Sequence, residues 1–141
     1  MRRSRAGRRV LVALEGFTAL TAVGGGVALA TGLEGHRFPA ELLRGTPFRS
    51  YVVPGLILAG AVGGSAAVAA AATVRGPRLG AWASVLAGSM LMGWIAGEVL
   101  ILRAPEARSR VEAGYFGAGL LMASLGLVEA AWPSSLVPRD R

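Results

Sequence analysis

Residues 51–74 read YVVPGLILAGAVGGSAAVAAAATV, a run without a single charged side chain. The hydrocarbon core of a bilayer needs about 20 apolar residues to be spanned by a helix. Lipid offers no hydrogen-bond partners to the backbone, so a run of this kind must satisfy its peptide groups internally. It is also too long, and too evenly apolar, to be a strand of a membrane barrel. The stretch therefore predicts a transmembrane helix.

Three more apolar runs of spanning length flank this one, at residues 10–33, 79–102 and 113–132. The short RGPR connection at 75–78 predicts that the second and third runs form an antiparallel hairpin. The connection at 34–50 is longer and partly apolar, so we expect it to lie in the membrane interface. The sequence thus predicts one all-α domain over residues 1–141, an integral membrane four-helix bundle whose first partner is the lipid bilayer.

Composition supports this class and excludes several others. Hydrophobic residues make up 53% of the chain and charged residues 16%, against roughly 25% charged in soluble domains. The net charge of +7 comes from arginines that flank the apolar runs, so we do not expect nucleic acid as a partner. The chain has no Cys and one His, which excludes disulfides, thiol redox chemistry and thiolate metal sites, and gives no basis for a metal or another cofactor.

Arginine counts predict the orientation, because positive charge accumulates on the cytoplasmic side. The N-terminus, residues 75–78 and the C-terminal tail hold nine arginines, and the two other connections hold six. We therefore expect both termini in the cytoplasm. The all-Arg, Ala- and Gly-rich usage is typical of a GC-rich bacterial genome, which suggests the bacterial inner membrane. An alternative is that the arginine-rich start, the apolar run and Ala28-Leu29-Ala30 form a cleaved signal peptide, which would leave three spans.

Small residues recur four apart within the runs, a spacing that lets helices approach closely in lipid. We expect these positions to form the contacts between helices of one chain; the alternative is that they form a dimer interface or a substrate groove. They are Gly24, Gly25 and Gly26 in the first run, Gly55, Ala59, Gly63, Ala67 and Ala71 in the second, Ser89, Gly93 and Gly97 in the third, and Gly119, Ala123, Gly126 and Ala130 in the fourth.

Each of the three flanking runs contains one carboxylate, and an ionisable group inside a span is a functional candidate by default. Glu98 follows Trp94 by one turn, and the predicted topology puts it level with the segment 45–51, GTPFRSY. Within that segment Thr46 can cap a helix and Pro47 suits a first turn. We therefore predict a polar cluster at this end of the bundle, either a structural ion pair or the floor of an outward-facing site, made of Glu98, Arg49, Tyr51, Trp94 and His36.

The other two carboxylates are secondary candidates. Glu15 lies less than two turns from Arg8 and Arg9, and we expect it to reach the cytoplasmic interface and pair with an arginine. Glu129 lies one turn from Trp132 and is expected at the same interface.

No set of residues in the chain suggests catalysis, so we do not expect an enzyme. The favoured interpretation is a structural, accessory or small binding subunit, alone, as a homo-oligomer or beside another membrane protein. The alternative is a small-solute or proton-coupled transporter that uses Glu98 or Glu15.

Three pieces of the chain resemble a group of small bacterial membrane proteins: ALTAVGGGVAL at 19–29, LLRGTPFRSYVVPGLILAGAVGG at 42–64 and GWIAGEV at 93–99. The resemblance implies a shared four-helix fold and no particular activity. The position of Glu15 in the first run is also similar to that of the essential Glu of small multidrug-resistance transporters. The wider motif around that Glu is missing here, and the loops are longer.

Overall fold

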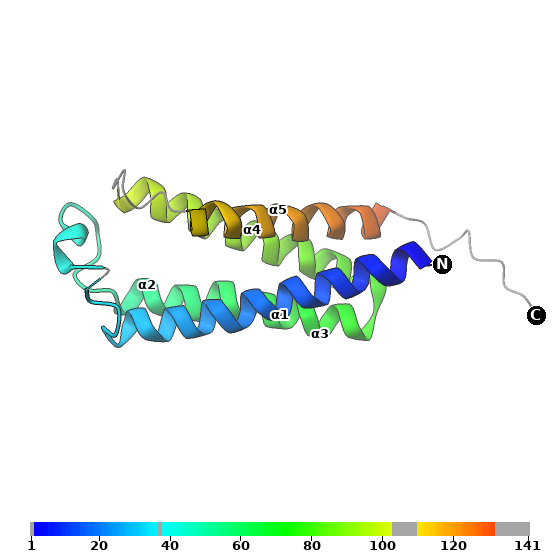
Figure 1. Cartoon of the computed structure of the whole chain (residues 1–141), viewed down its shortest axis with the longest axis horizontal. Coiled ribbons are helices and arrows are strands. Elements are labelled where there is room, and N and C mark those ends of the chain that lie inside the picture. The colour runs from blue at the N-terminus through cyan, green and yellow to red at the C-terminus, as the bar shows by residue number, and fades with distance from the viewer. Residues whose placement is uncertain (1, 37, 103–109, 132–141) are drawn as a thin grey trace, which may run out of the picture.

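The computed structural model describes residues 2–36, 38–102 and 110–131. Over these residues the chain is helical, with no strand (Figure 1). The elements in chain order are α1 (Arg2–Ala30), the 3₁₀ turn η1 (Ala40–Leu43), α2 (Val52–Ile57), the π-helical segment η2 (Leu58–Gly63), α3 (Gly64–Arg75), α4 (Pro77–Leu102) and α5 (Arg110–Ala131).

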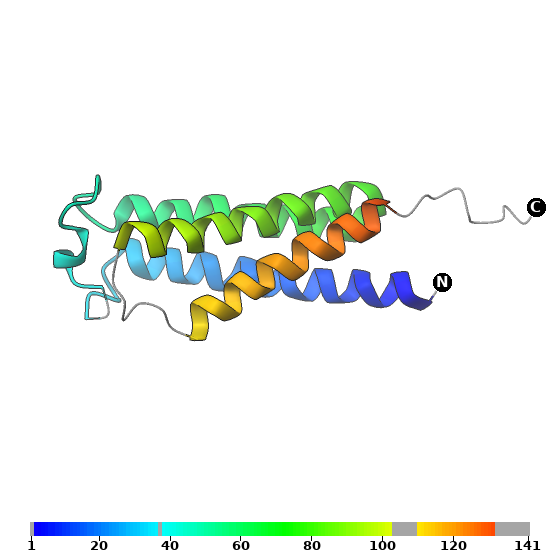
Figure 2. The same cartoon turned by 90° about the horizontal axis from the view of Figure 1, so that it is seen from above.

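The helices form two pairs that lie side by side. In Figure 1, α1 runs along the rod made of α2, η2 and α3, and α5 runs along α4. Figure 2 shows that α5 is inclined to the other helices. The start of α1 and the end of α5 lie at one end of the bundle, called here the N-terminal end; the segment 31–51 lies at the other, called here the loop end.

The four predicted helices are confirmed; the first begins eight residues earlier than its apolar run, at Arg2, and the other ends shift by up to three residues. The first helix ends at Ala30 rather than at residue 33, because Gly32 adopts a positive φ of 75°. The N–H of Gly32 bonds the carbonyl oxygen of Leu29 at 3.3 Å, and the N–H of Leu33 bonds that of Ala28 at 3.0 Å. This is a Schellman motif, in which glycine tolerates the left-handed backbone that closes the helix.

The second apolar run is one rod with a change of winding in the middle. It starts at Val52 and not near Thr46, so the predicted cap is wrong. The hydroxyl of Thr46 instead donates to the carbonyl oxygen of Leu43 at 2.8 Å, which stabilises the turn before the helix. Pro54 sits in the first turn, where a helix needs no N–H from it, and the departure from α geometry comes later, in η2.

The connection between α3 and α4 is a single residue, Gly76, and Pro77 occupies the first position of α4, where its ring suits the backbone. Arg8 reaches across from α1 to the end of α3. Its Nε donates to the carbonyl oxygen of Thr73 at 2.8 Å and its Nη2 donates to that of Val74. These carbonyls are among those a helix end leaves unpaired, so the arginine ties two helices together at the N-terminal end.

Glycines let the helices of each pair touch through their backbones. A Cβ on Gly26 of α1 would lie 2.5 Å from the carbonyl oxygen of Gly55, and one on Gly63 would lie 2.7 Å from the Val23 side chain. In the other pair, a Cβ on Gly126 of α5 would lie 2.6 Å from the carbonyl oxygen of Ala81. The small residues of the fourth run and the first half of the second therefore do pack as expected.

Several other expected contacts are wrong. Ala67 is exposed, and the buried positions of α3 are Ala66, Ala69, Ala72 and Thr73; the π-helical turns before it place a different face inward. On α4, Ser89 is exposed, and Cβ atoms on Gly93 and Gly97 would meet nothing within 4 Å. Gly24 of α1 likewise has open space around it.

The outward surface of the bundle is strongly apolar, with Leu20 78% and Leu100 73% exposed. Four helices are long and apolar enough to cross a membrane: Arg5–Ala30, Val52–Arg75, Pro77–Ile101 and Arg110–Ala131. Soluble proteins rarely expose so much contiguous apolar surface. The fold is therefore that expected of a membrane protein.

Candidate functional site

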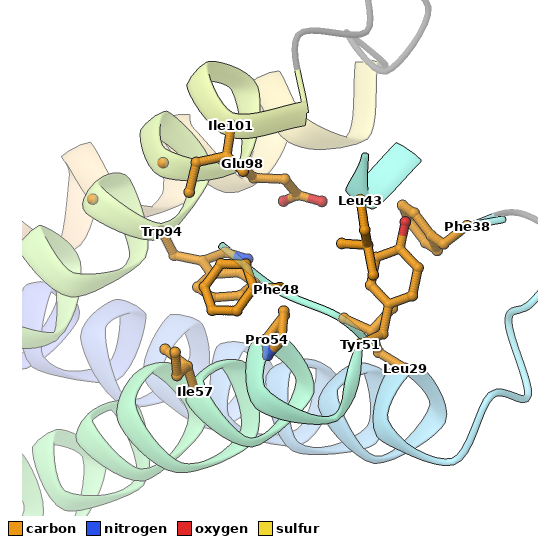
Figure 3. Close-up of a pocket in the computed structure, with 12 residues that line it drawn as sticks. Leu29, Phe38, Leu43, Phe48, Tyr51, Pro54, Ile57, Trp94, Glu98 and Ile101 are labelled. Atoms are coloured by element: carbon orange, nitrogen blue, oxygen red, sulfur yellow. The ribbon is translucent and has the colours of Figure 1, made fainter. Parts of the chain in front are cut away.

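A partly open cavity of about 200 Å³ lies at the loop end, between α2 and α4. Its walls are almost entirely apolar, and four of its lining side chains are aromatic: Phe38, Phe48, Tyr51 and Trp94. Figure 3 shows these rings around the space, with the Glu98 side chain extending into it from α4.

The loop that closes this cavity is held by a few specific contacts. Leu43, at the end of η1, is 6% exposed and lines the cavity. The hydroxyl of Tyr51 donates to the carbonyl oxygen of Pro39 at 3.2 Å. The rings of Phe38 and Tyr51 are 6.0 Å apart at 58°, a tilted arrangement that aromatic pairs favour. Apolar residues of this connection therefore pack against the loop end of the bundle; that the connection lies in the membrane interface stays a prediction.

Two glycines explain why there is space here at all. Gly93 and Gly97 lie one turn apart on α4 and line the cavity. Because they carry no side chain and no helix packs against them, they form an open wall rather than the predicted contact with the second helix.

Glu98 is the one carboxylate among the residues that line the cavity. The indole N–H of Trp94 is close enough to interact with it, and so is the charge of Glu112 at the start of α5. No hydrogen bond or ion pair joins Glu98 to Arg49, Tyr51 or His36, all of which belong to the described part of the chain.

The structure therefore brings together part of the predicted cluster. Glu98, Trp94 and Tyr51 line one cavity, whereas Arg49 and His36 are exposed and lie outside its lining. The expected Glu98–Arg49 pair is wrong, because Arg49 precedes the helix start at Val52 and its side chain faces outward. Sequence reasoning missed the apolar walls supplied by Ile57 and Ile101, which no motif singles out.

Tyr51 is coupled to the acidic groups around it. Burial, and then the negative charges of Glu41 and Glu98, raise the pKa of the Tyr51 phenol above its ordinary value. Each cause disfavours the phenolate, since a low-dielectric surrounding and a nearby like charge both penalise it. Glu98 therefore lies within electrostatic reach of Tyr51 at the cavity rim.

Glu15 occupies a very different environment from the one predicted. Its side chain is 0% exposed, and it meets the hydroxyls of Ser84 on α4 and Thr73 on α3, the latter at 3.4 Å. The expected pairing with Arg8 is wrong, because that arginine binds the carbonyl oxygens at the end of α3. The carboxylate thus lies inside the bundle, at the junction of three helices.

A second pocket, of about 240 Å³, opens at the N-terminal end. It is more polar than the first, and its lining consists of Arg5, Arg8, Leu11, Thr73, Pro77, Ala81 and Glu129. Glu129 is partly exposed there, at the same end as the arginines, as expected. Trp132, its predicted neighbour, lies outside the described residues.

No group of His, Cys, Asp and Glu in the described segments is arranged to hold a metal ion. No family model, curated protein or solved structure matches the chain. The resemblance of residues 19–102 to small bacterial membrane proteins therefore stays a prediction, and function has to be argued from the two sites themselves.

Proposed function

We propose that this protein is a small binding subunit of the bacterial inner membrane, and that it holds an apolar cation in the cavity at the loop end. The observation that supports this is one carboxylate, Glu98, on the wall of an otherwise apolar, aromatic cavity. With both termini in the cytoplasm, as the arginines predict, the cavity faces outward.

The chemistry of the lining selects for charge sign. Aromatic faces attract cations through their quadrupole, most strongly for Trp, and cages of such rings bind quaternary ammonium groups. In its ionised form Glu98 places a negative charge on one wall, and a bound cation would favour that form; Glu112 and Glu41 lie within electrostatic reach of the same rim. The same negative groups would repel an anion.

The size of the cavity selects for a small ligand or head group. Its volume of about 200 Å³ is below the roughly 300–1,000 Å³ typical of pockets for drug-sized ligands. A single ring with an ammonium group fits this space. A longer amphiphile would leave its tail in the surrounding lipid.

The test uses benzyltrimethylammonium and its neutral isostere neopentylbenzene, with Trp94 fluorescence as readout. Trp82 and Trp132 are first changed to Phe, so that Trp94 is the one remaining tryptophan. The cation should quench the signal saturably, and Glu98→Gln should weaken its binding about tenfold or more, which is at least about 1.4 kcal/mol. Glu129→Gln, at the other end of the bundle, is the matched control.

Gly97→Leu supplies an independent check, because Gly97 lines the cavity and a Cβ there would meet nothing within 4 Å, so the added side chain enters the cavity. Binding should be lost while the fold persists. Equal affinity for the neutral isostere, or an affinity unchanged by Glu98→Gln, contradicts a cation site.

Transport is the second candidate, favoured by the polar pocket at the opposite end of the bundle. Transport requires access from both sides, and binding does not. Uptake of the same cation into proteoliposomes under an imposed pH gradient distinguishes them: flux above that of Glu98→Gln liposomes supports transport, and saturable binding without flux supports the binding subunit.

A further inference from the structure

The cluster around Glu15 has no role in the loop-end cavity, yet it contains the most deeply buried carboxylate of the described residues. Three helices meet there: α1 contributes Glu15, α3 contributes Thr73 and α4 contributes Ser84. All three side chains are at most 3% exposed. A charge at such a position needs a counter-charge or full hydrogen bonding.

Neither requirement is met by the groups present. Among the described residues, Oε2 of Glu15 is buried and has no hydrogen-bond partner, and Oε1 meets hydroxyls only. Three charged residues, Arg5 and Arg8 on α1 and Glu129 on α5, line the adjoining N-terminal pocket, and no ion pair joins any of them to Glu15 within the described part of the chain. The polar side chains that α3 and α4 place against Glu15 are the hydroxyls of Thr73 and Ser84.

Counting hydrogens within the cluster gives a second argument. Ser84 Oγ lies close to Glu15 Oε1 and 2.8 Å from the carbonyl oxygen of Gly80. A serine hydroxyl has one hydrogen, and the Gly80 oxygen can only accept. If Ser84 donates to Gly80, the hydrogen between Ser84 and Glu15 must come from the carboxyl group. A proton on Oε1 completes the chain Glu15 to Ser84 to Gly80, and Thr73 can still donate to Glu15.

The cluster also has a route to water. Thr73 bonds Glu15 and lines the N-terminal pocket. Two more lining residues, Leu11 and Ala81, lie about one helical turn from Glu15 and Ser84. Thr73 is therefore the residue that connects the lining of the pocket with the carboxyl group.

We propose that Glu15 is a buried site for one exchangeable proton, which reaches it from the N-terminal end of the bundle past Thr73. The proton is taken from water in the pocket and returned to it, with no other bond made or broken. This site is independent of any ligand at the loop end, so its failure and that of the proposed cation site are separately visible.

Infrared spectroscopy of the full chain in lipid nanodiscs tests the proposal directly. A carbonyl band of a protonated carboxyl group should be present near neutral pH, vanish in Glu15→Gln and persist in Glu98→Gln. Transfer to D₂O should shift it, because the proton exchanges. A spectrum without a band assignable to Glu15, or with one that does not shift in D₂O, overturns the proposal.

Two further variants keep the test decisive if Glu15→Gln fails to fold. Ser84→Ala removes the acceptor of the proposed proton, so the carbonyl band should move to higher frequency, which a purely structural serine would not cause. Thr73→Val should slow the D₂O shift, whereas Thr18→Val, at a buried threonine that contacts Met122, should not. Equal exchange rates in the two threonine variants contradict the route past Thr73.

A sodium ion is the rival occupant, since carboxylate and hydroxyl oxygens also suit that cation. Replacing choline chloride by sodium chloride at constant pH distinguishes the two. Loss of the band in sodium means that a metal ion displaces the proton, and it overturns the assignment of a proton site. An unchanged band supports it.

Discussion

Ser84 on α4 and Glu15 on α1 are joined by a buried hydrogen bond across 69 positions of sequence. The two residues belong to different helix pairs, so this bond links the two halves of the bundle, as do the longer contacts of Thr73 with Ser84 and of Thr18 with the sulfur of Met122. Side-chain hydrogen bonds inside a bundle fix the rotation of one helix against another, because moving either helix breaks them. The link therefore sets the register of α4 on α1.

Ser84→Ala should destabilise the bundle by about 1–3 kcal/mol, because the Glu15 carboxyl would keep only its long contact with Thr73. Ser89→Ala is the matched control, since Ser89 is an exposed serine on the same helix and should change stability by less than about 0.5 kcal/mol. Denaturation in mixed micelles, followed by circular dichroism, measures both. Equal losses would mean that the hydrogen bond adds nothing to stability.

Gly26→Val should damage the packing of α1 on α2, whereas Gly24→Val should be tolerated. A Cβ at Gly26 would lie 2.5 Å from the carbonyl oxygen of Gly55 and 2.6 Å from the amide nitrogen of Ala59, and one at Gly24 would meet nothing within 4 Å. Overpacking of this kind costs typically about 1–3 kcal/mol. Thermal unfolding in detergent compares the same substitution two positions apart, and similar melting temperatures would contradict the close helix approach.

The titration of Tyr51 should report on Glu98. Tyr51 and Tyr115 are the two tyrosines of the chain, so Tyr115→Phe leaves one phenol for ultraviolet difference absorption. Adding Glu98→Gln removes one of the charges that raise the pKa of Tyr51, and the titration should move to lower pH. Glu129→Gln should leave it in place.

The same shift has a consequence for stability with a definite sign. Because the pKa of Tyr51 is raised in the folded chain, the folded state holds its proton when the unfolded state has lost it. The contribution to stability is complete below the unfolded pKa and is lost as pH rises through the folded one. A Tyr51→Phe variant should show a shallower fall of stability at alkaline pH, and an identical fall in both proteins would contradict the coupling.

Topology can be measured without background labelling, because the chain has no Cys. With both termini in the cytoplasm, a cysteine at exposed Arg49 should react with an impermeant maleimide in intact cells, and one at exposed Arg75 should react only after permeabilisation. The reverse pattern would invert the orientation and turn the loop-end cavity toward the cytoplasm.

The helices were predictable from sequence because length and hydropathy determine them in lipid. Which face of each helix packs against its neighbours was harder to predict. Small residues spaced four apart predict a stripe only while the helix keeps one winding, and η2 interrupts the rod between Ile57 and Gly64. Gly93 and Gly97 on α4 have the spacing of a contact motif, but what they line is decided by where the neighbouring helices diverge, which one sequence does not contain.

Of the two candidate sites, one was partly predictable from the sequence and the other was not. Glu98, Trp94 and Tyr51 were predictable as a group, because helix direction alone sets their depth. The environment of Glu15 was not predictable. Its position along α1 is close to Arg8, but the rotation of α1 about its axis turns the Glu15 side chain into the interior of the bundle. Thr73 and Ser84 were a usable signal: each stands near the RGPR turn at 75–78, one before and one after it, and a hairpin brings such positions to similar depth.

The one-residue connection at Gly76 also constrains how the protein is made. A single residue between α3 and α4 cannot cross a bilayer, so Arg75 and Arg78 must stay on the same side throughout insertion. The second span gains its buried neighbours Gly80 and Ser84 only when the third has emerged from the ribosome. We therefore expect these two spans to enter the membrane together as one hairpin, so that assembly of the bundle takes fewer independent insertion steps than there are helices.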